Sequence, residues 1–304
     1  MIAYFYSWLR YCKGKRGYFF LYRCIKLFLN VLYPLIIFFK KPYGCSGCKN
    51  GIIVSLTTFP ARITKVHLVI ETLMHQTMKP EKIILWLAET QFESKDRLPK
   101  KLLKLQERGL EIRFCEDLRS HKKYYYSMLY YPEHMIITVD DDTFYPETLI
   151  EDLMQTHRKY PDCVCCMLAH KMLIKHETVM PYKQWISGIE GISEPSYLLV
   201  PIGCEGVLYP PHILSKYVFE KRTFRQICSQ ADDLWLKAMS TLNNVKVMPC
   251  YTKSITFANL WNAKKFSLNE LNVGQNLNDR QLKNLMERYP EILEKWKKAS
   301  EEIL

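Results

Sequence analysis

Residues 135–146 read Met-Ile-Ile-Thr-Val-Asp-Asp-Asp-Thr-Phe-Tyr-Pro, and the rest of the fold can be worked out from this stretch. Its first five residues are mostly apolar and β-branched, without alternating polarity. This pattern predicts a strand over 135–139 that is buried on both faces of a parallel sheet. If the chain stays extended beyond the strand, side chains alternate between faces, so Asp140 and Asp142 point one way and Asp141 points the other.

Carboxylates at the end of such a strand suggest a ligand site. Open α/β sheets bind ligands beyond the carboxyl ends of their strands. A site made only of oxygen ligands suits a hard cation such as Mg²⁺ or Mn²⁺, which commonly bridges to phosphates. The alternative is an acidic loop or a helix cap, where aspartate is also common. The position directly after a buried strand favours a metal–diphosphate site.

Three further apolar runs precede this strand, at 52–56, 82–87 and 110–114. Segments with helical spacing separate them, and the resulting β-α-β-α-β order is typical of an α/β fold with a mainly parallel sheet flanked by helices. Further helices are predicted at 146–159 and over 280–304, the latter interrupted at Pro290. Residues 171–200 have no clear periodicity, and their aromatic side chains are suited to lining a pocket.

Loops at the predicted strand ends carry residues suited to binding a nucleotide. The first strand is followed by Thr57, Phe59 and Arg62, although a helix cap explains the threonines almost as well. Between the third and fourth strands, Lys122 or Lys123 can reach a phosphate near the strand ends. A solvated charged loop is the alternative for these lysines.

A second acidic element, Ala-Asp-Asp-Leu-Trp-Leu, lies at 231–236. Good helix formers follow it, so Asp232 and Asp233 are predicted at a helix start. The helix dipole favours carboxylates there, and a capping role is therefore the alternative to a catalytic one. Where a metal neutralises a diphosphate leaving group, a separate carboxylate can take the proton from an incoming hydroxyl.

The formal net charge of +12 is concentrated near the N-terminus, because residues 1–41 contain eight Lys or Arg residues and no Asp or Glu. This distribution argues against a nucleic-acid partner. Aromatic residues are interleaved with the cations, and the longest uncharged piece, 27–39, is shorter than the ~18–20 residues that a spanning helix needs. The segment therefore predicts binding to an anionic membrane surface. A re-entrant or weakly spanning segment, a docking helix and a nucleic-acid arm are the alternatives.

Eleven cysteines in a chain of 304 residues are interpreted as free thiols of a reducing compartment. Cys45 and Cys48 have the spacing of zinc ligands, but no second pair follows them. Core packing is the default role for the remaining cysteines.

Four motifs together resemble bacterial glycosyltransferases of the GT-A fold, similar to family 2 and to polysaccharide or lipopolysaccharide glycosyltransferases. The motifs are Ser-Leu-Thr-Thr-Phe-Pro-Ala-Arg at 55–62, Val-Asp-Asp-Asp-x-x-Tyr-Pro at 139–146, Gly-Val-Leu-Tyr-Pro-Pro at 206–211 and Ala-Asp-Asp-x-Trp-Leu at 231–236. The resemblance covers about residues 51–280. It implies a GT-A-like catalytic domain at 51–265, which the composition of the chain sets between a basic segment at 1–41 with a linker at 42–50 and a helical extension at 266–304.

The resemblance also implies roles for individual residues. Asp140 and Asp142 become the DxD-type pair that binds ribose and Mn²⁺ or Mg²⁺, and Asp233 becomes the general base with Asp232 beside it. The donor-binding residues that it implies are Thr57, Phe59, Arg62, Lys123, Asp140 and Asp141. Family 2 enzymes usually have an aspartate after the second strand, where this chain has Glu89, so Glu89 joins this group as its substitute.

The implied reaction moves a sugar from a nucleotide sugar to a hydroxyl of a glycan or lipid-linked acceptor, with inversion. The basic segment at 1–41 predicts a location at the cytoplasmic face of the inner membrane, and a chain that begins near Gly51 is expected to become soluble and to keep nucleotide binding. Two other classes remain. A phosphatase of the haloacid-dehalogenase type also has a strand followed by Asp-x-Asp, but usually at its first strand. A non-catalytic membrane-associated binding protein on a transferase scaffold is the other alternative.

Overall fold

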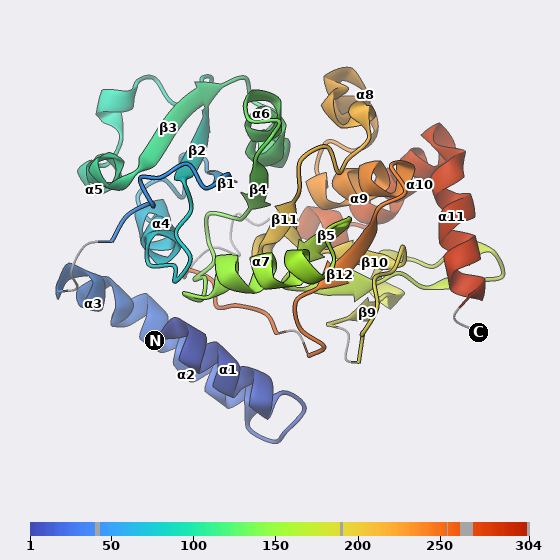
Figure 1. The fold of residues 1–304 in the computed structure, drawn as a ribbon, viewed down its shortest axis with the longest axis horizontal. Helices are drawn as coiled ribbons and strands as arrows, with labels where there is room; N and C mark the ends of the chain where they lie inside the picture. Colours follow the sequence, from blue (N-terminus) through green and yellow to red (C-terminus); the bar gives the residue numbers. More distant parts are fainter. Residues whose placement is uncertain (40–42, 189–190, 254, 262–269, 303–304) are drawn as a thin grey trace.

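The computed structural model describes residues 1–39, 43–188, 191–253, 255–261 and 270–302. A seven-stranded sheet runs through the molecule in the order β12-β5-β11-β4-β1-β2-β3 (Figure 1). Its strands are β1 (Ile52–Thr57), β2 (Lys82–Ala88), β3 (Leu110–Cys115), β4 (Met135–Thr138), β5 (Cys163–Cys166), β11 (Val207–Tyr209) and β12 (Lys246–Pro249). The strand that carries the acidic triplet, β4, is in the middle.

The sheet is mixed but mainly parallel. Strands β4, β1, β2 and β3 pair in parallel, and β12 pairs in parallel with β5. Strand β11 is antiparallel to both of its neighbours, β4 and β5. The predicted α/β fold is therefore confirmed, and β11 brings the loop before it alongside the end of β4.

Alternating side chains of the strands divide the interior into two cores. Ile52, Val54 and Leu56 of β1 belong to one core, and Ile53 belongs to the other. The first core packs against α4 (Val66–Met74) and α7 (Leu149–Lys159). The second packs against α6 (Lys122–Tyr130), α9 (Asp232–Leu242), α10 (Leu277–Arg288) and α11 (Pro290–Glu301). Helices thus cover both faces, as a parallel sheet requires.

Some predicted boundaries differ from the structure. Strand β4 ends at Thr138, one residue earlier than predicted, and Asp141 begins a turn. Helix α7 begins at Leu149, although the prediction started it at residue 146. Residues 171–200 contain short strands that the periodicity did not indicate. They are β7 (Ile174–Lys175), β8 (Thr178–Val179), β9 (Ile186–Ser187) and most of β10 (Leu199–Pro201), with β9 and β10 flanking β6 (Ala169–Lys171) in a small sheet.

The basic N-terminal segment forms helices α1 (Ile2–Cys12), α2 (Tyr18–Val31) and α3 (Tyr33–Phe39), which lie along the side of the molecule next to α4 and α7 (Figure 1). We call α1 and α2 the N-terminal hairpin. Apolar side chains three or four positions apart form one buried stripe on each helix, as expected for an amphipathic helix on a protein surface. These side chains are Ile2, Tyr6, Leu9, Ile25 and Leu29.

Hydrogen bonds fix the hairpin to the body. The buried hydroxyl of Tyr6 donates to the carbonyl of Phe144 at 2.8 Å and accepts from the backbone N–H of Ala258 at 2.9 Å. In the described ranges no helix is long and apolar enough to cross a membrane. Lys40, Lys41 and the predicted domain boundary at 265/266 lie outside the described residues.

The C-terminal helices are predicted except for their start, because α10 begins at Leu277 and not at residue 280. Pro290 separates α10 from α11 and occupies the first turn of α11, where its missing N–H costs no helical hydrogen bond. All eleven cysteines have free thiols, and five of them are buried in the cores.

Candidate active site

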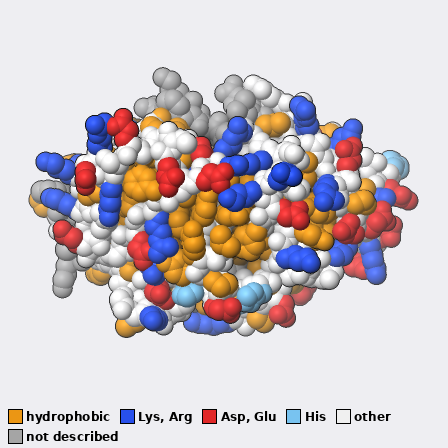
Figure 2. Space-filling model, turned by 90° about the horizontal axis from the view of Figure 1, so that it is seen from above, with side chains coloured by type: hydrophobic (Ala, Val, Ile, Leu, Met, Phe, Trp, Pro, Cys, Tyr) orange, Lys and Arg blue, Asp and Glu red, His pale blue; other side chains and the backbone are white. Residues whose placement is uncertain are grey.

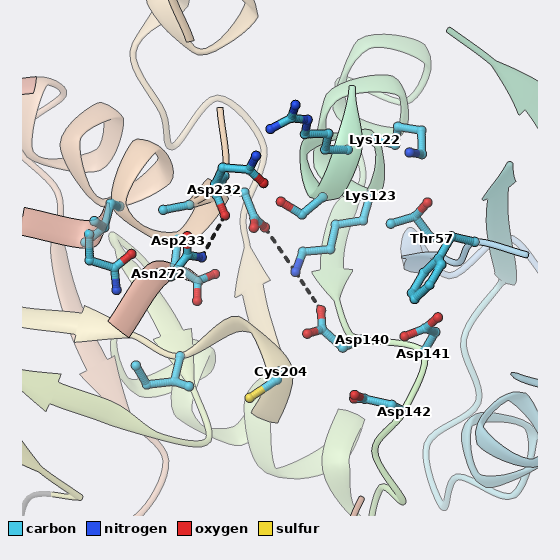
Figure 3. Close-up of a pocket in the computed structure, with 18 of the residues that line it drawn as sticks. Thr57, Lys122, Lys123, Asp140, Asp141, Asp142, Cys204, Asp232, Asp233 and Asn272 are labelled. Carbon is cyan, nitrogen blue, oxygen red and sulfur yellow. Dashed lines mark hydrogen bonds and ion pairs between the residues drawn. The ribbon is translucent and has the colours of Figure 1, made fainter. Parts of the chain in front are cut away.

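Four element ends meet around one cavity of ≈ 750 Å³. They are the last residue of β1, the acidic triplet after β4, and the first residues of α6 and of α9. The sequence-predicted residues that line it are Thr57, Phe59, Arg62, Lys122, Lys123, Asp140, Asp141, Asp142, Asp232 and Asp233. The two acidic elements, about ninety residues apart in sequence, therefore share one cavity (Figure 3).

The acidic triplet is held by a cation and a hydroxyl from the loop after β1. Arg62 Nη1 lies 2.6 Å from Asp141 Oδ1 and 2.9 Å from Asp142 Oδ2. The hydroxyl of Thr58 donates to Asp141 Oδ2 at 2.5 Å. Burial raises the pKa of Asp142 to about 6 even though Arg62 opposes the shift. Burial likewise raises the pKa of Asp141 against the effect of Arg62.

Asp140 and Asp142 both line the cavity, but Asp141 does not point away from Asp142 as the predicted alternation requires. Because β4 ends at Thr138 and the triplet enters a turn, strict alternation no longer applies. Asp141 and Asp142 share Arg62, whereas Asp140 binds Lys123.

Lys123 connects the two acidic elements. Its buried amino group lies 2.7 Å from Asp140 Oδ1 and 3.0 Å from Asp232 Oδ2 (Figure 3). Burial alone lowers the pKa of Lys123, but the two carboxylates outweigh it and raise that pKa well above its usual value. The hydroxyl of Ser55 on β1 donates to the carbonyl of Lys123 at 2.5 Å and so fixes the start of α6. Lys123 is therefore a charged, rigidly held group.

The two carboxylates at the start of α9 have different surroundings. Burial by itself raises the pKa of Asp232, but Lys123 and His121 hold it below the usual value. Burial and the charge of Asp232 instead raise the pKa of Asp233 to about 7. Asp233 Oδ2 accepts a hydrogen bond from the backbone N–H of Gly203 at 2.9 Å. Asp232 thus remains an anion paired with a lysine, and Asp233 has the affinity for protons that a general base needs near neutral pH.

Position 203 requires a glycine because the Asp233 carboxylate lies so close to its backbone. A Cβ on residue 203 would lie 2.3 Å from Asp233 Oδ1, which is shorter than any real contact. The same loop is tied to the triplet through Tyr145, whose hydroxyl donates to the carbonyl of Cys204 at 2.7 Å and accepts from the N–H of Asp140 at 2.8 Å. The loop before β11 therefore sets the separation of the two acidic elements.

The carboxylates fit a metal that other ligands complete. Asp140 and Asp142 both line the cavity, but across the described part of the chain no three His, Cys, Asp or Glu side chains are grouped closely enough to hold an ion. Mg²⁺ is commonly bound by one or two carboxylates together with water and substrate phosphates. The donor set suits that mode rather than a cage made only of protein groups.

Glu89 is the one predicted site residue that does not line the cavity, and its side chain is exposed after β2. A different polar group occupies this edge of the cavity. Asp117 accepts hydrogen bonds from Gln91 Nε2 at 3.0 Å and from Lys122 Nζ at 2.5 Å. Asp117 follows β3, whereas the family pattern directs attention to the end of β2. The roles implied for all these residues stay predictions.

The sequence did not predict the polar groups on the α9 and α10 side of the cavity. Asn272 and Asn278 line it, and the buried Oδ1 atom of each has no hydrogen-bond partner within the described ranges. Tyr182, from the region expected to supply aromatic groups, lines the same side. The asparagine-rich run at 272–278 was the available signal, but asparagine is too common in turns for the run to indicate a site.

No family model and no curated protein matches the sequence. Similar chain paths occur among solved structures at low identity. TarS 1–349 of S. aureus is 11% identical with a TM-score of 0.45, and the match covers 83% of this chain and 90% of that one. Mannosyltransferase PcManGT from Pyrobaculum calidifontis, in complex with GDP-Man and Mn²⁺, is 10% identical with a TM-score of 0.41, covering 82% and 66%.

GalNAc-T7 with UDP, GalNAc and Mn²⁺ is 11% identical, again with a TM-score of 0.41. That match covers 80% of this chain and 57% of the GalNAc-T7 chain. At these identities, a functional assignment for this chain depends on its own site residues.

Proposed function

We propose that this protein is a metal-dependent glycosyltransferase that moves a sugar from a nucleoside diphosphate sugar to an acceptor hydroxyl. The observation that carries the proposal is the cavity in which Lys123 joins Asp140 of the first acidic element to Asp232 of the second. Asp233 lies beside this pair, with its pKa raised to about 7 mainly by burial. Anion-binding groups and a group able to accept a proton are thus adjacent, as transfer from a diphosphate requires.

The donor is proposed to bind between the loop after β1 and the start of α6. Arg62, Lys122 and Lys123 supply positive charge there, and the N-terminal end of α6 adds its dipole, which favours phosphate. Thr57 and Phe59 line the same side, with Asp117 and Gln91 at its edge as candidates for contacts with the base. Mn²⁺ or Mg²⁺ at Asp140 and Asp142 would neutralise charge on the diphosphate as it leaves.

Asp233 is proposed as the general base. The acceptor hydroxyl gives its proton to the Asp233 carboxylate as its oxygen bonds to the anomeric carbon. The bond from that carbon to the diphosphate oxygen breaks at the same time, and the diphosphate leaves with the electron pair. Asp232 is committed to Lys123 at 3.0 Å, which makes it a positioning residue. Inversion at the anomeric carbon follows from the resemblance to family 2.

The acceptor is proposed to bind on the α9 and α10 side of Asp233. The unpartnered oxygens of Asn272 and Asn278 can accept hydrogen bonds from sugar hydroxyls, and Tyr182 offers a ring for contact with a sugar face. A glycan or lipid-linked glycan matches this combination of polar and aromatic groups.

The test compares the purified protein with the double variant Asp140→Asn/Asp142→Asn. Thermal unfolding is followed with Mn²⁺ and each of UDP, GDP, CDP and dTDP. One nucleotide is expected to raise the melting temperature of the unchanged protein only when Mn²⁺ is present, and the double variant should lose this effect. Asp96→Asn, at an exposed position outside the cavity, is the matched control and should retain it.

Metal-dependent protection that survives in the double variant would overturn the assignment of these carboxylates. Hydrolysis or transfer from the matching nucleotide sugar, measured by release of the nucleoside diphosphate, separates an enzyme from a binding protein. Binding without any release would favour the non-catalytic alternative.

A further inference from the structure

Exposed apolar side chains are concentrated on the three N-terminal helices. Among the described residues, seventeen large hydrophobic side chains are exposed, and eleven of them lie in residues 1–39. Phe19 and Phe20, at the start of α2, are 77% and 74% exposed. Scattered exposed apolar residues are normal on soluble proteins, whereas a contiguous group marks an interaction surface.

The exposed side chains form stripes opposite the buried ones. On α1 the outward stripe contains Met1, Tyr4, Trp8 and Tyr11, and on α2 it contains Phe20, Cys24, Leu27 and Val31. Positions three or four apart share a helix face. The buried stripes of both helices belong to the same core, so the opposite stripes face away from the body. We call these outward stripes, together with Phe19 and the exposed residues Leu32, Leu35 and Phe39, the outer hairpin face.

Positive charge accompanies the outer hairpin face. Lys15, Arg16 and Arg23 are exposed, and the Lys15 amino group lies 3.5 Å from the centre of the Tyr11 ring. Residues 1–41 contain no acidic residue. By contrast, Figure 2 views the molecule from the side opposite the hairpin, where acidic and basic side chains are interspersed around the hydrophobic ones. On the hairpin, by comparison, the charged side chains beside the exposed aromatic rings are all cationic.

We propose that the outer hairpin face binds the surface of an anionic phospholipid bilayer, with α1 and α2 lying in the plane of the membrane. Aromatic rings favour the depth of the lipid headgroups, and Lys and Arg beside them bind lipid phosphates. A complementary protein surface would have to match both the shape of the exposed aromatic side chains and the positive charge around them. A fluid anionic membrane surface can accept the aromatic side chains and neutralise the positive charge without a matching shape.

Because each helix keeps its buried stripe on the body, only one side of the hairpin can enter lipid. The inner side holds Asn30, whose side chain donates to the carbonyl of Asn259 at 3.1 Å and accepts from the N–H of Trp261 at 2.7 Å. Leu260, which lies between Asn259 and Trp261, donates its N–H to the carbonyl of Asp142 at 2.7 Å. A single strip of chain thus separates the hairpin from the acidic triplet, so a docked protein would hold its cavity close to the bilayer. A lipid-linked acceptor follows from this placement only if the proposed transferase function is correct.

The docking test uses the full chain and sedimentation with vesicles of phosphatidylcholine, with or without phosphatidylglycerol. The protein is expected to sediment only with the anionic vesicles. Raising NaCl from about 0.1 M to about 1 M shortens the screening length from ~10 Å to ~3 Å and should release only part of it, because apolar burial persists. Phe19→Ser/Phe20→Ser should lower the partition coefficient about tenfold or more. Lys15→Gln/Arg16→Gln/Arg23→Gln should lower it about 10- to 100-fold at low salt.

Two controls make the same kinds of change outside the hairpin. Leu129→Ser removes an apolar side chain of α6 that is 46% exposed, and Lys104→Gln/Lys175→Gln removes exposed positive charge. Both should bind vesicles as the unchanged protein does. Melting temperatures verify folding, and Tyr4→Ser/Tyr11→Ser on α1 replaces the phenylalanine variant if that one does not fold.

The proposal is overturned if the unchanged protein stays in the supernatant with anionic vesicles, or if the hairpin variants bind no more weakly than the controls. Sedimentation velocity without lipid tests the other occupant, a second copy of the chain. A dimer that the phenylalanine variant abolishes, without vesicle binding by either protein, would replace the membrane with a self-association surface. Nucleotide protection is measured in parallel, so failure of docking and failure of the proposed transferase function are distinguishable.

Discussion

Replacing Tyr6 by phenylalanine should destabilise the protein even though it removes a single oxygen atom. The Tyr6 hydroxyl is buried between the carbonyl of Phe144 and the N–H of Ala258, at 2.8 and 2.9 Å. The Tyr6 ring packs on Phe257 with the ring centres 4.6 Å apart, and phenylalanine keeps this contact. The substitution therefore isolates the hydrogen bonds from the packing.

The size of the effect follows from the two groups left behind. A buried donor or acceptor without a partner costs about 1–3 kcal/mol, so losing partners for both should cost about 2–6 kcal/mol. At roughly 2 °C per kcal/mol for a chain of this size, the melting temperature should fall by about 4–12 °C. Urea unfolding followed by tryptophan fluorescence measures the free energy directly. Because Phe144 is two residues from Asp142, nucleotide protection in the presence of Mn²⁺ should weaken as well.

Tyr11→Phe is the matched control, because the Tyr11 side chain is on the same helix and is 69% exposed. Its free energy of unfolding should stay within about 0.5 kcal/mol of that of the unchanged protein. If Tyr6→Phe proves no more destabilising than Tyr11→Phe, the hairpin does not dock through this hydroxyl in solution.

Further predictions concern the site itself. Asp233→Asn should lower turnover roughly 10²–10⁴-fold and leave Mn²⁺-dependent nucleotide protection intact. Asp232→Asn should mainly lower stability, because Lys123 loses a buried partner. If the two variants show the reverse pattern, the roles of Asp232 and Asp233 are exchanged. A general base acts when it is deprotonated, and the pKa of Asp233 is raised to about 7, mainly by burial. The value of kcat/KM should therefore fall about tenfold per pH unit below about pH 7 and level off above it. A flat profile between about pH 5 and pH 8 would contradict this role. Gly203→Ala should reduce turnover without abolishing nucleotide binding, because the added Cβ would lie 2.3 Å from Asp233 Oδ1; unchanged turnover would show that the two can separate freely. Burial raises the pKa of Glu205 from 4.5 to about 8, so the folded protein favours the neutral carboxyl group and loses stability as pH rises through that interval. In urea titrations with EDTA, the stability of Glu205→Gln relative to the unchanged protein should therefore increase between about pH 5 and pH 8. A difference in stability that does not depend on pH would refute the raised pKa.

The strands at the centre of the sheet could be predicted because they are uniformly apolar. Strands β1, β2 and β4 each have a run that is buried on both faces, and short-range pattern is sufficient for such strands. The antiparallel strand β11 was not predicted as a neighbour of β4, because three residues carry too little pattern and its pairing is determined by contacts distant in sequence. The short strands between residues 171 and 200 were missed for the same reason.

The sequence predicted which residues form the site better than it predicted how they are arranged. Carboxylates after a buried strand and at a helix start indicated both acidic elements. Their ion pairs with Arg62 and Lys123 depend on the turn that begins after Thr138, which period-two alternation does not describe. Asn272 and Asn278 reach the cavity only through the packing of the C-terminal helices.

The hairpin shows the largest difference between composition and structure. Its aromatic and basic composition indicated a peripheral segment that could be removed by starting the chain near Gly51. The buried stripe instead shares a core with α4 and α7, so we expect such a shortened chain to expose that core and to aggregate.

The hydroxyl of Tyr6 and the backbone of Ala258 are 252 positions apart, and this separation has a consequence during synthesis. At ~5–20 residues per second, a ribosome needs roughly 10–50 s to produce the partner after the tyrosine. Throughout that interval the nascent hairpin lacks this hydrogen bond to the body, while loop closure and hairpin collapse are complete in microseconds. Helices α1 and α2 are therefore synthesised well before the last of the groups that fix them in the fold. Any surface that binds them early competes directly with the folding of the protein.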